Sequence, residues 1–371
     1  MSHRIRRQGV PFEVARLLRA QIRGSMKAGD AFPSVEALST QYGVSVNTVM
    51  AALSVLDREG WVERRHGSGI FATSRAERPC VGLYSELDLL NRRSSVFFRE
   101  VPHALWSFFD SKGIQTEFYM GHTQPGQEPE EPTCRRFFAD VESGVLDGVV
   151  VVSAPQSESW CARFRACPVP LVNGAMEASV GLNAKSVRAG VQRLAEQGCR
   201  RPALVVWGPD LYRDAFTEAA KASGMELREG WIRSAAHPGL AGGGWEEFRE
   251  IWSAYREKPD GLLVLDDGLF EDVKIAIRDL GIQVPSQLRI VAHANKGFHL
   301  DHPFPVTLLE CDPEAFAEGL GSLLLHRMPP TQNVKSAAEM PIQTVETPMK
   351  IVEWVPQNVS STAGAGKRSK S

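Results

Sequence analysis

Residues 28–73 read AGDAFPSVEALSTQYGVSVNTVMAALSVLDREGWVERRHGSGIFAT, and this stretch decides the fold of the N-terminal part of the chain. Ser34 precedes a short run of apolar residues at helical spacing, and Gly43 ends it, which is typical of a capped helix. Ser45 precedes a second such run, which ends at Gly60. Because only two residues separate the first helix from the cap of the second, the pair is predicted to form a helix-turn-helix.

Two short apolar segments follow these helices. They are Trp61–Arg64 and Ile70–Thr73, and the HGSG between them supplies the glycines that a hairpin turn requires. Upstream, apolar residues at helical spacing predict another helix that ends near Gly24. Its apolar residues are Val14, Leu17, Leu18 and Ile22. The first block is therefore predicted to contain three helices and a hairpin, the arrangement of a winged helix-turn-helix.

The charge of this block differs from that of the rest of the chain. Residues 1–75 hold ten Arg and one Lys against six acidic residues, a balance of +5. Since the whole chain of 371 residues has a net charge of −2, the remaining residues carry −7. A basic block fused to an acidic body favours a polyanionic partner for the block alone.

Candidate DNA contacts lie at the start of the second capped helix and on the hairpin. A recognition helix reads bases through side chains that project from its first turns. Asn47 can read an adenine edge, Thr48 a base edge or a thymine methyl group, and Ser45 a phosphate. On the hairpin, glycines allow close approach of the backbone to DNA beside basic side chains. The candidate DNA-binding residues are Ser34, Ser45, Asn47, Thr48, Arg64, Arg65, His66, Gly67, Ser68 and Gly69.

The first block resembles the winged helix-turn-helix of GntR-type bacterial regulators. The matching features are Ala28-Gly29-Asp30, Pro33-Ser34, Gly43-Val44-Ser45, Thr48-Val49, Ala52-Leu53, Glu59-Gly60 and Gly67-Ser68-Gly69. The chain departs from the family at Glu36, Val46 and Met50, where Arg is frequent. The resemblance implies DNA binding, but the departures mean that the operator code of relatives cannot be carried over. Phosphate anchoring is expected to rely on the hairpin arginines and on Arg4, Arg6 and Arg7. The alternative is a protein-interaction module with a solvated basic face.

From Cys80 onward, short β-branched segments alternate with stretches of helical periodicity, which predicts parallel sheets covered by helices. The expected strands are Cys80–Tyr84, Thr116–Tyr119, Gly148–Val152, Pro170–Asn173, Ala203–Val206, Gly261–Leu265 and Arg289–Ala292. A segment of this length favours two doubly wound lobes over one wide sheet. We expect a DNA-binding domain at 1–74, a linker at 75–79, a two-lobed domain at 80–356 and a disordered tail at 357–371.

This body resembles the effector domain of LacI/GalR-type regulators, which look like periplasmic sugar-binding proteins. The resemblance covers roughly Cys80 to Glu353, and its motifs include LDGVVVV (146–152), VRAGVQRLAEQGCRRPALV (187–205), LLVLDDGLFEDV (262–273) and LGIQVPSQLRIVAHAN (280–295). It implies an α/β fold class in which the winged helix-turn-helix precedes a two-lobed, doubly wound, periplasmic-binding-protein-like domain. The departures are Cys199 in place of a His, and His293-Ala294-Asn295 in place of an aromatic-Asp pair.

Ligand candidates follow the apolar strands, because doubly wound lobes bind ligands at the carboxyl ends of their strands. The candidates are Ser85, Phe97, Ser153, Asn173, Trp207, Arg213, Asp267 and His293. By motif position, Phe97 is expected to stack on an apolar ligand face, Arg213 to donate hydrogen bonds and Asp267 to accept them. Such a set suits a sugar or another polyol. The alternatives are that Phe97 is core while Phe98 faces the ligand, that Arg213 and Asp267 form a structural ion pair, and that Trp207 is only packed.

Several function classes find no support in the sequence. It has no GxSxG, HExxH, P-loop or dinucleotide fingerprint, so we expect no catalytic residues, no metal and no cofactor. The six cysteines have no CxxC spacing and are expected to be reduced core residues. Apolar stretches fall short of the about 20 residues that a membrane span needs, and the charged first residues do not form a signal peptide. We therefore expect a cytoplasmic protein without membrane contact.

These observations predict a DNA-binding transcription regulator that responds to a ligand. We expect it to repress carbohydrate-related genes. Each chain has one DNA-binding domain, so we expect a homodimer that binds an inverted-repeat operator in double-stranded DNA. A small sugar-like effector would bind in the cleft between the lobes. The competing interpretation is a cytoplasmic carbohydrate-binding or enzymatic domain with an accessory helical interaction module.

Overall fold

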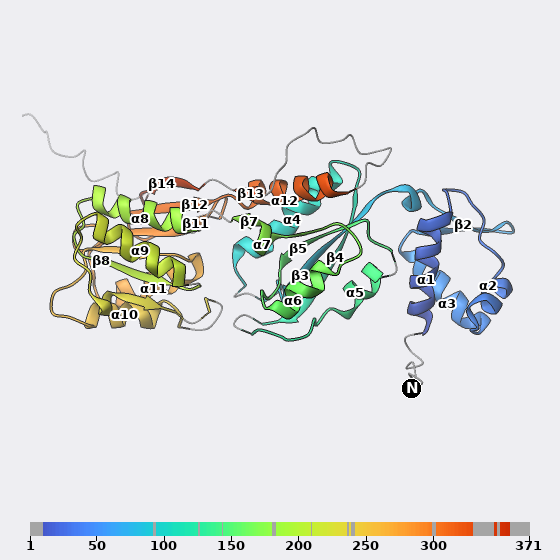
Figure 1. The fold of residues 1–371 in the computed structure, drawn as a ribbon, viewed down its shortest axis with the longest axis horizontal. Helices are drawn as coiled ribbons and strands as arrows, with labels where there is room; N and C mark the ends of the chain where they lie inside the picture. The colour runs from blue at the N-terminus through green and yellow to red at the C-terminus, as the bar shows by residue number, and fades with distance from the viewer. Residues whose placement is uncertain are drawn as a thin grey trace, which may run out of the picture.

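The computed structural model describes residues 10–91, 94–124, 127–142, 144–179, 183–208, 210–235, 237–238, 242–298, 302–328, 345–346 and 349–356. Three bodies follow one another along the long axis of the molecule (Figure 1). We call them the head (residues 10–73), the N-lobe (residues 80–177 with helix α12) and the C-lobe (residues 184–311 with strand β14). The expected α/β fold with an N-terminal winged helix-turn-helix and two lobes is confirmed.

The head is built from α1 (Val10–Ser25), α2 (Val35–Tyr42), α3 (Val46–Arg58), β1 (Val62–Arg65) and β2 (Gly69–Ala72). Ser34 accepts the N–H of Ala37 and Ser45 accepts the N–H of Thr48, so both predicted caps are formed. The antiparallel hairpin pairs Val62 with Ala72 and is shifted by one residue from the predicted segments. Of the apolar residues that predicted α1, Val14, Leu18 and Ile22 form its buried face, whereas Leu17 is 38% exposed.

The N-lobe has a parallel sheet in the order β4-β3-β5-β6. Its elements are β3 (Cys80–Leu87), α4 (Val96–Asp110), β4 (Gln115–Thr123), α5 (Arg135–Glu142), β5 (Gly148–Ser153), α6 (Glu158–Arg165), β6 (Leu171–Asn173), α7 (Gly174–Glu177) and α12 (Pro313–Arg327). Helices α4 and α12 pack together over one face of the sheet, with Val101, Leu105 and Leu320 in their shared core. Gly321 permits this close approach, since a Cβ there would lie 2.4 Å from the Phe108 ring.

The C-lobe has a sheet in the order β14-β12-β11-β10-β8-β9, parallel except for β14. Its elements are α8 (Ala184–Glu196), β8 (Pro202–Val206), α9 (Asp210–Ala222), β9 (Ile232–Ser234), α10 (Trp245–Ser253), β10 (Gly261–Val264), α11 (Asp267–Asp279), β11 (Arg289–Asn295), β12 (Val306–Cys311) and β14 (Lys350–Trp354). The predicted strands appear with small shifts. Strands β9, β12 and β14 were not predicted, although every residue of β12 is buried.

The described elements pass between the lobes three times. The chain enters the C-lobe beyond β7 (Ala178–Ser179), returns to the N-lobe from β12 into α12, and re-enters the C-lobe from β13 (Val345–Glu346) to β14. Strands β7 and β13 pair in parallel. At the second crossing, Asp312 caps α12 and also accepts a 2.6 Å hydrogen bond from Lys296.

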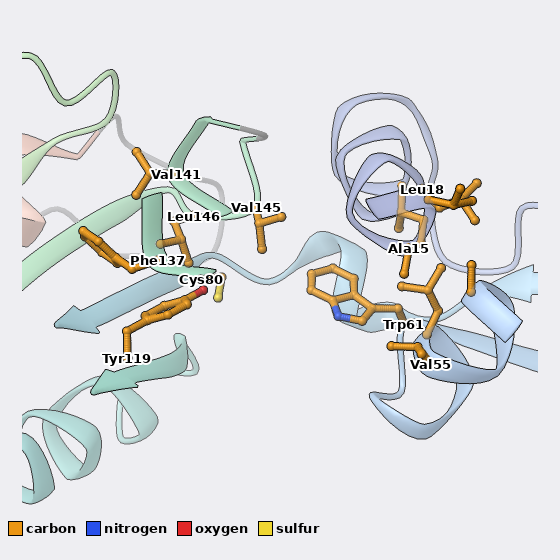
Figure 2. Close-up of a cluster of buried hydrophobic side chains, with 14 of the residues drawn as sticks. Ala15, Leu18, Val55, Trp61, Cys80, Tyr119, Phe137, Val141, Val145 and Leu146 are labelled. Atoms are coloured by element: carbon orange, nitrogen blue, oxygen red, sulfur yellow. The ribbon is translucent and has the colours of Figure 1, made fainter. Parts of the chain in front are cut away.

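The head is docked on the N-lobe through a largely apolar contact. Trp61 is 1% exposed, and its ring lies on the side of the head that faces the N-lobe residues Phe137 and Leu146 (Figure 2). Residues 75–79, the expected linker, lie between the two bodies and include part of the 3-10 turn Ser74–Glu77. Arg75 lies 4.8 Å from the Trp61 ring centroid and forms a 2.5 Å ion pair with Glu117 of β4.

Two nearly buried arginines of α1 add ion pairs to this contact. Arg19 donates to Glu59 within the head at 2.9 Å and lies 3.7 Å from Asp140 of α5, where the two side chains are 8% and 4% exposed. Arg23 pairs with Asp147, which also accepts the backbone N–H of Cys80 at 2.6 Å. Buried charges retain such partners because an unpaired buried charge is costly. The head is therefore held on the N-lobe by oriented ion pairs as well as by apolar burial.

Other expectations from the sequence have mixed outcomes. All six cysteines are free, but only Cys80, Cys199 and Cys311 are buried. The core assignment is wrong for the half-buried Cys134, Cys161 and Cys167. The expected tail at 357–371, and Arg4, Arg6 and Arg7, lie outside the described residues. Among the helices that the structure describes, none has the length and apolar character to cross a membrane.

Asp140→Ala is expected to lower the free energy of unfolding by about 3–5 kcal/mol, because it removes one of the two carboxylate partners of the buried Arg19 and the acceptor of the Tyr119 hydroxyl, which donates to Asp140 at 2.9 Å. Urea denaturation followed by tryptophan fluorescence measures the change. The control is Glu218→Ala, which removes the exposed Arg188–Glu218 pair and should cost less than about 1 kcal/mol. Equal denaturation midpoints for the two variants would contradict the anchoring role of Asp140.

Candidate DNA-binding face and effector site

The start of α3 presents small polar groups to solvent. Ser45 Oγ accepts the Thr48 N–H at 3.2 Å and lies 2.9 Å from Thr48 Oγ1, so the two hydroxyls form one cluster at the helix N-terminus. Asn47 is exposed beside them, and Ser34 is exposed at the start of α2. A helix N-terminus with free polar side chains can bind phosphate and present hydrogen-bonding groups to bases. The structure thus brings together the helical part of the predicted DNA-binding set.

The hairpin places its basic side chains beside α3. Arg64 donates to Ser54 Oγ of α3 at 2.8 Å and lies 3.5 Å from Asp57. Arg65 lies 4.4 Å from the Phe71 ring centroid and pairs with Glu63 at 2.5 Å. At the tip, Gly67 and Gly69 have φ angles of 70° and 118°, which glycine adopts readily. His66 and Ser68 are exposed between the arginines and the second glycine. A phosphate bound by Arg64 would take the place of the exposed Asp57, and one bound by Arg65 would take the place of the exposed Glu63.

Two N-lobe candidates, Ser85 and Phe97, are buried in the structure. Ser85 is fully buried and donates to the Leu87 carbonyl at 3.3 Å, because β3 continues beyond its expected end at Tyr84. Phe97 is 4% exposed, and its ring centroid lies 5.1 Å from that of Phe316 in α12. The return of α12 to the N-lobe therefore makes Phe97 a core residue, as the alternative allowed.

The remaining N-lobe candidates lie at the carboxyl ends of adjacent strands. Ser153 ends β5 and is half-buried. Asn173 ends β6, is 4% exposed, and donates its backbone N–H to Glu177 at 2.9 Å. Phe98 is half-buried against the core beside Phe97. This edge keeps Ser153 and Asn173 as the N-lobe part of the predicted site.

The C-lobe candidates also lie beyond the carboxyl ends of their strands. Trp207 follows β8, is 41% exposed, and its ring centroid lies 4.6 Å from that of His237. Arg213 donates to Ser234 at 3.2 Å, and Asp267 accepts from Asn295 at 2.8 Å. Arg213 and Asp267 therefore do not form the ion pair with each other that was the alternative expectation from the sequence. Both side chains instead have neutral partners within the described residues.

Asn295 is a site residue that sequence reasoning missed. It is the last residue of β11, 1% exposed, and its Oδ1 has no hydrogen-bond partner among the described residues. His293 is 7% exposed, and its Nδ1 likewise lacks a partner there. The available signal was the His293-Ala294-Asn295 departure, which marks this strand end as unusual. Buried polar atoms without partners are rare in proteins, so this pair is suited to bind polar groups of a ligand.

Two neighbouring carboxyl groups, Asp266 and Asp267, add charge to this region, and Asp267 interacts with His293. Burial lowers the pKa of His293, and the charge of Asp267 opposes that shift. Asp266 caps α11 by accepting the Leu269 N–H at 2.9 Å. Burial, together with the neighbouring Asp267 charge, raises the pKa of Asp266 to about 7. This region therefore holds an imidazole whose charged form is disfavoured by burial, an amide and two neighbouring carboxyl groups.

Asp266→Asn tests this electrostatic environment, because asparagine is as good a helix cap as aspartate. A raised native pKa means that the unfolded state loses its proton first, so stability falls as pH rises from about 4 to about 7. Relative to the unsubstituted chain, the variant should therefore gain about 2–3 kcal/mol between pH 5 and pH 8. Chemical denaturation at the two pH values measures the difference. A constant difference across this range would contradict the raised pKa.

Within the described residues, no group of three or more His, Cys, Asp or Glu side chains is arranged to hold a metal ion. The arrangement is instead that of two binding surfaces. One is an exposed, basic winged helix-turn-helix, and the other is a set of polar side chains at the strand ends of two lobes. Both offer hydrogen bonds and charge to a ligand.

Comparison with known families divides the chain in the same way. Residues 12–72 match the family described as "Bacterial regulatory proteins, gntR family". Residues 191–353 match the family described as "Periplasmic binding protein-like domain". The two matches fall on the head and on the C-lobe with the returning helix α12.

Curated relatives extend this comparison. The arabinose metabolism transcriptional repressor of Halalkalibacterium halodurans is 22% identical over 306 residues, which cover 74% of this chain and 79% of the relative. The HTH-type transcriptional repressor YtrA of Bacillus subtilis is 38% identical over 60 residues, or 16% of this chain and 46% of the relative. The second similarity is thus confined to a segment the size of the head.

Solved structures share the fold. A putative transcriptional regulator LacI from Bacillus cereus subsp. cytotoxis matches with a TM-score of 0.59 and 16% identity, covering 75% of this chain and 98% of the other. A complex of the transcriptional regulator CelR with cellobiose matches with a TM-score of 0.59 and 18% identity, covering 87% of this chain and 99% of the other. The chain therefore joins a segment that matches the gntR family to a segment that matches the periplasmic binding protein-like domain, which is the domain arrangement of a DNA-binding transcription regulator with an effector-binding body.

Proposed function

We propose that this regulator is a repressor of carbohydrate-related genes that acts in the cytoplasm. Residues 1–74 bind double-stranded DNA, residues 75–79 link the domains, and residues 80–356 bind a small sugar or polyol. The observation that carries the proposal is the pairing of two features in one chain. The exposed start of α3 forms a reading surface, and the buried polar pair His293 and Asn295 has unmet hydrogen-bonding capacity at a strand end.

A sugar or polyol is the effector class that the polar set favours. Asp267 can accept hydrogen bonds from hydroxyl groups, Arg213 can donate them, and Trp207 offers an exposed ring to an apolar sugar face. The relative from Halalkalibacterium halodurans, named for arabinose metabolism, and the CelR complex with cellobiose support the same class. We place the effector between the lobes, where strand ends of both carry polar residues.

A homodimer on an inverted repeat follows from the single head of each chain, since a two-fold pair of heads reads a two-fold DNA site. Effector binding would close the two lobes and change the separation of the heads. The docking of the head on the N-lobe through Trp61, Arg19 and Arg75 supports this route, because motion of the N-lobe would carry the head with it. The effector needs only different affinities for the two dimer states.

DNA binding is tested with Asn47→Ala and Arg65→Ala over a salt series. Asn47→Ala is expected to weaken operator binding by about 1–3 kcal/mol and to spare scrambled DNA, because a base contact discriminates sequences. Arg65→Ala should weaken binding to both DNAs and reduce the salt dependence, because a phosphate contact is independent of sequence. Equal losses on both DNAs for Asn47→Ala would contradict base reading, and salt-independent binding would contradict the DNA-binding proposal.

Effector binding is tested by a thermal-shift screen of pentoses, hexoses, disaccharides and polyols. A ligand at 100 times its dissociation constant stabilises the folded state by about 2.7 kcal/mol. Asp267→Asn should abolish this gain and leave the melting temperature without ligand nearly unchanged, because Asn can still accept from Asn295. Arg163→Ala, at an exposed surface ion pair of the N-lobe, is the control and should retain the response. Retention of the full shift by Asp267→Asn would contradict this site.

A further inference from the structure

The first two turns of α3 expose a pair of apolar side chains. Val46 is 43% exposed and Met50 is 37% exposed, whereas Val49, Ala52 and Leu53 of the same helix are completely buried. Residues four apart lie on one face of a helix, so Val46 and Met50 form a single apolar strip. The folded head leaves this strip in water at the end of the helix that carries Ser45 and Asn47.

The surroundings of the strip indicate what it contacts. One exposed apolar residue is ordinary on a protein surface. Here, however, two lie together at the start of the helix that carries the candidate base contacts. Arg58, at the end of α3, and Arg64 and Arg65, on the hairpin beside it, are partly or largely exposed. Val46 and Met50 therefore present apolar groups on a surface that also carries exposed arginines. This combination is complementary to the DNA major groove, where each thymine exposes an apolar C5-methyl group.

We propose that Val46 and Met50 are specificity residues that pack against thymine methyl groups in each operator half-site. This inference rests on the proposed DNA-binding function and deepens it. An arginine at either position would instead donate two hydrogen bonds to a guanine. The neighbouring Asn47 presents an amide suited to adenine, so all three side chains favour A·T base pairs beneath the start of α3.

The geometry of the helix limits where the thymines lie. Four residues of helix rise by about 6 Å, which corresponds to roughly two base-pair steps of 3.4 Å. Val46 and Met50 therefore reach thymines that are one or two steps apart. Because each side chain is exposed and already on the correct face, contact requires no rearrangement of the head.

The experiment first selects operators from a random duplex library with the full-length chain. Thymines of the selected half-site are then replaced one at a time by deoxyuridine, which removes only the C5-methyl group. We expect a loss of about fourfold in affinity at two thymines one or two steps apart, the equivalent of about 0.8 kcal/mol for one buried carbon. Val46→Ala should become insensitive to replacement of one of these thymines, and Met50→Ala to replacement of the other.

The matched control is Leu17→Ala, which truncates an equally exposed apolar residue on α1 and should keep full sensitivity to deoxyuridine. Val46→Arg should move the preferred base at its position toward guanine. Melting temperatures and particle masses of all variants are measured in parallel. Unchanged melting temperatures and masses are expected, because the substituted side chains are exposed.

Different failures separate the two proposals. If the selected operator binds with unchanged affinity after every deoxyuridine replacement, thymine reading is overturned while DNA binding stands. If Val46→Ala or Met50→Ala instead reduces the particle mass and leaves deoxyuridine sensitivity intact, the strip is a contact between copies of this chain, which also overturns thymine reading. If no DNA sequence is enriched and no salt-dependent binding occurs, the proposed function and this inference fall together.

Discussion

The contact of Arg19 with Asp140 joins the two functions of this chain. Arg19 is nearly buried and needs both Glu59 of the head and Asp140 of the N-lobe as partners. Losing one partner of a buried ion pair costs several kcal/mol, a large share of the stability of a protein domain. Separation of the head from the N-lobe is therefore opposed by electrostatics as well as by the burial of Trp61. The head is an extension of the N-lobe in this structure, and its orientation depends on that lobe.

This attachment limits how an effector signal can reach DNA. Three chain crossings connect the lobes, and one of them is fixed by Asp312, which both caps α12 and binds Lys296. A change in lobe angle at these crossings moves the N-lobe and its docked head together. Coupling free energies of about 1–3 kcal/mol suffice for such regulation. That range is smaller than the cost of breaking the head contact, so rotation of intact bodies is the less costly route.

Local signals made much of the fold predictable. Ser34 and Ser45 identified two helix starts, the glycines of the hairpin identified the wing, and β-branched runs identified most strands of both sheets. Each of these features depends on residues within one turn or one strand. The sequence therefore predicted the head and the order of the lobes without knowledge of distant contacts.

Features that depend on long-range pairing were missed or misassigned. Phe97 was expected from its motif position to stack on a ligand, with a core position as the alternative, and no local pattern shows that α12 returns from the C-lobe to place Phe316 against it. Ser85 was placed after its strand, although pairing with β4 extends β3 to Leu87. Residues Arg19 and Asp140 are separated by more than a hundred positions, so their pairing left no local pattern. Asn295 stood in a motif departure of the sequence, but its candidacy as a site residue rests on burial and on the unpartnered Oδ1, which only the structure shows.

The two candidate sites differ in how freely their specificity can change. Val46 and Met50 are exposed, so substitution there alters the groups offered to DNA with little effect on the packed head. His293 and Asn295 are buried beside Asp267, so substitution there also changes the balance of hydrogen bonds and charge within the C-lobe. Operator preference can therefore change independently of stability, whereas a change of effector requires compensating changes around the end of β11.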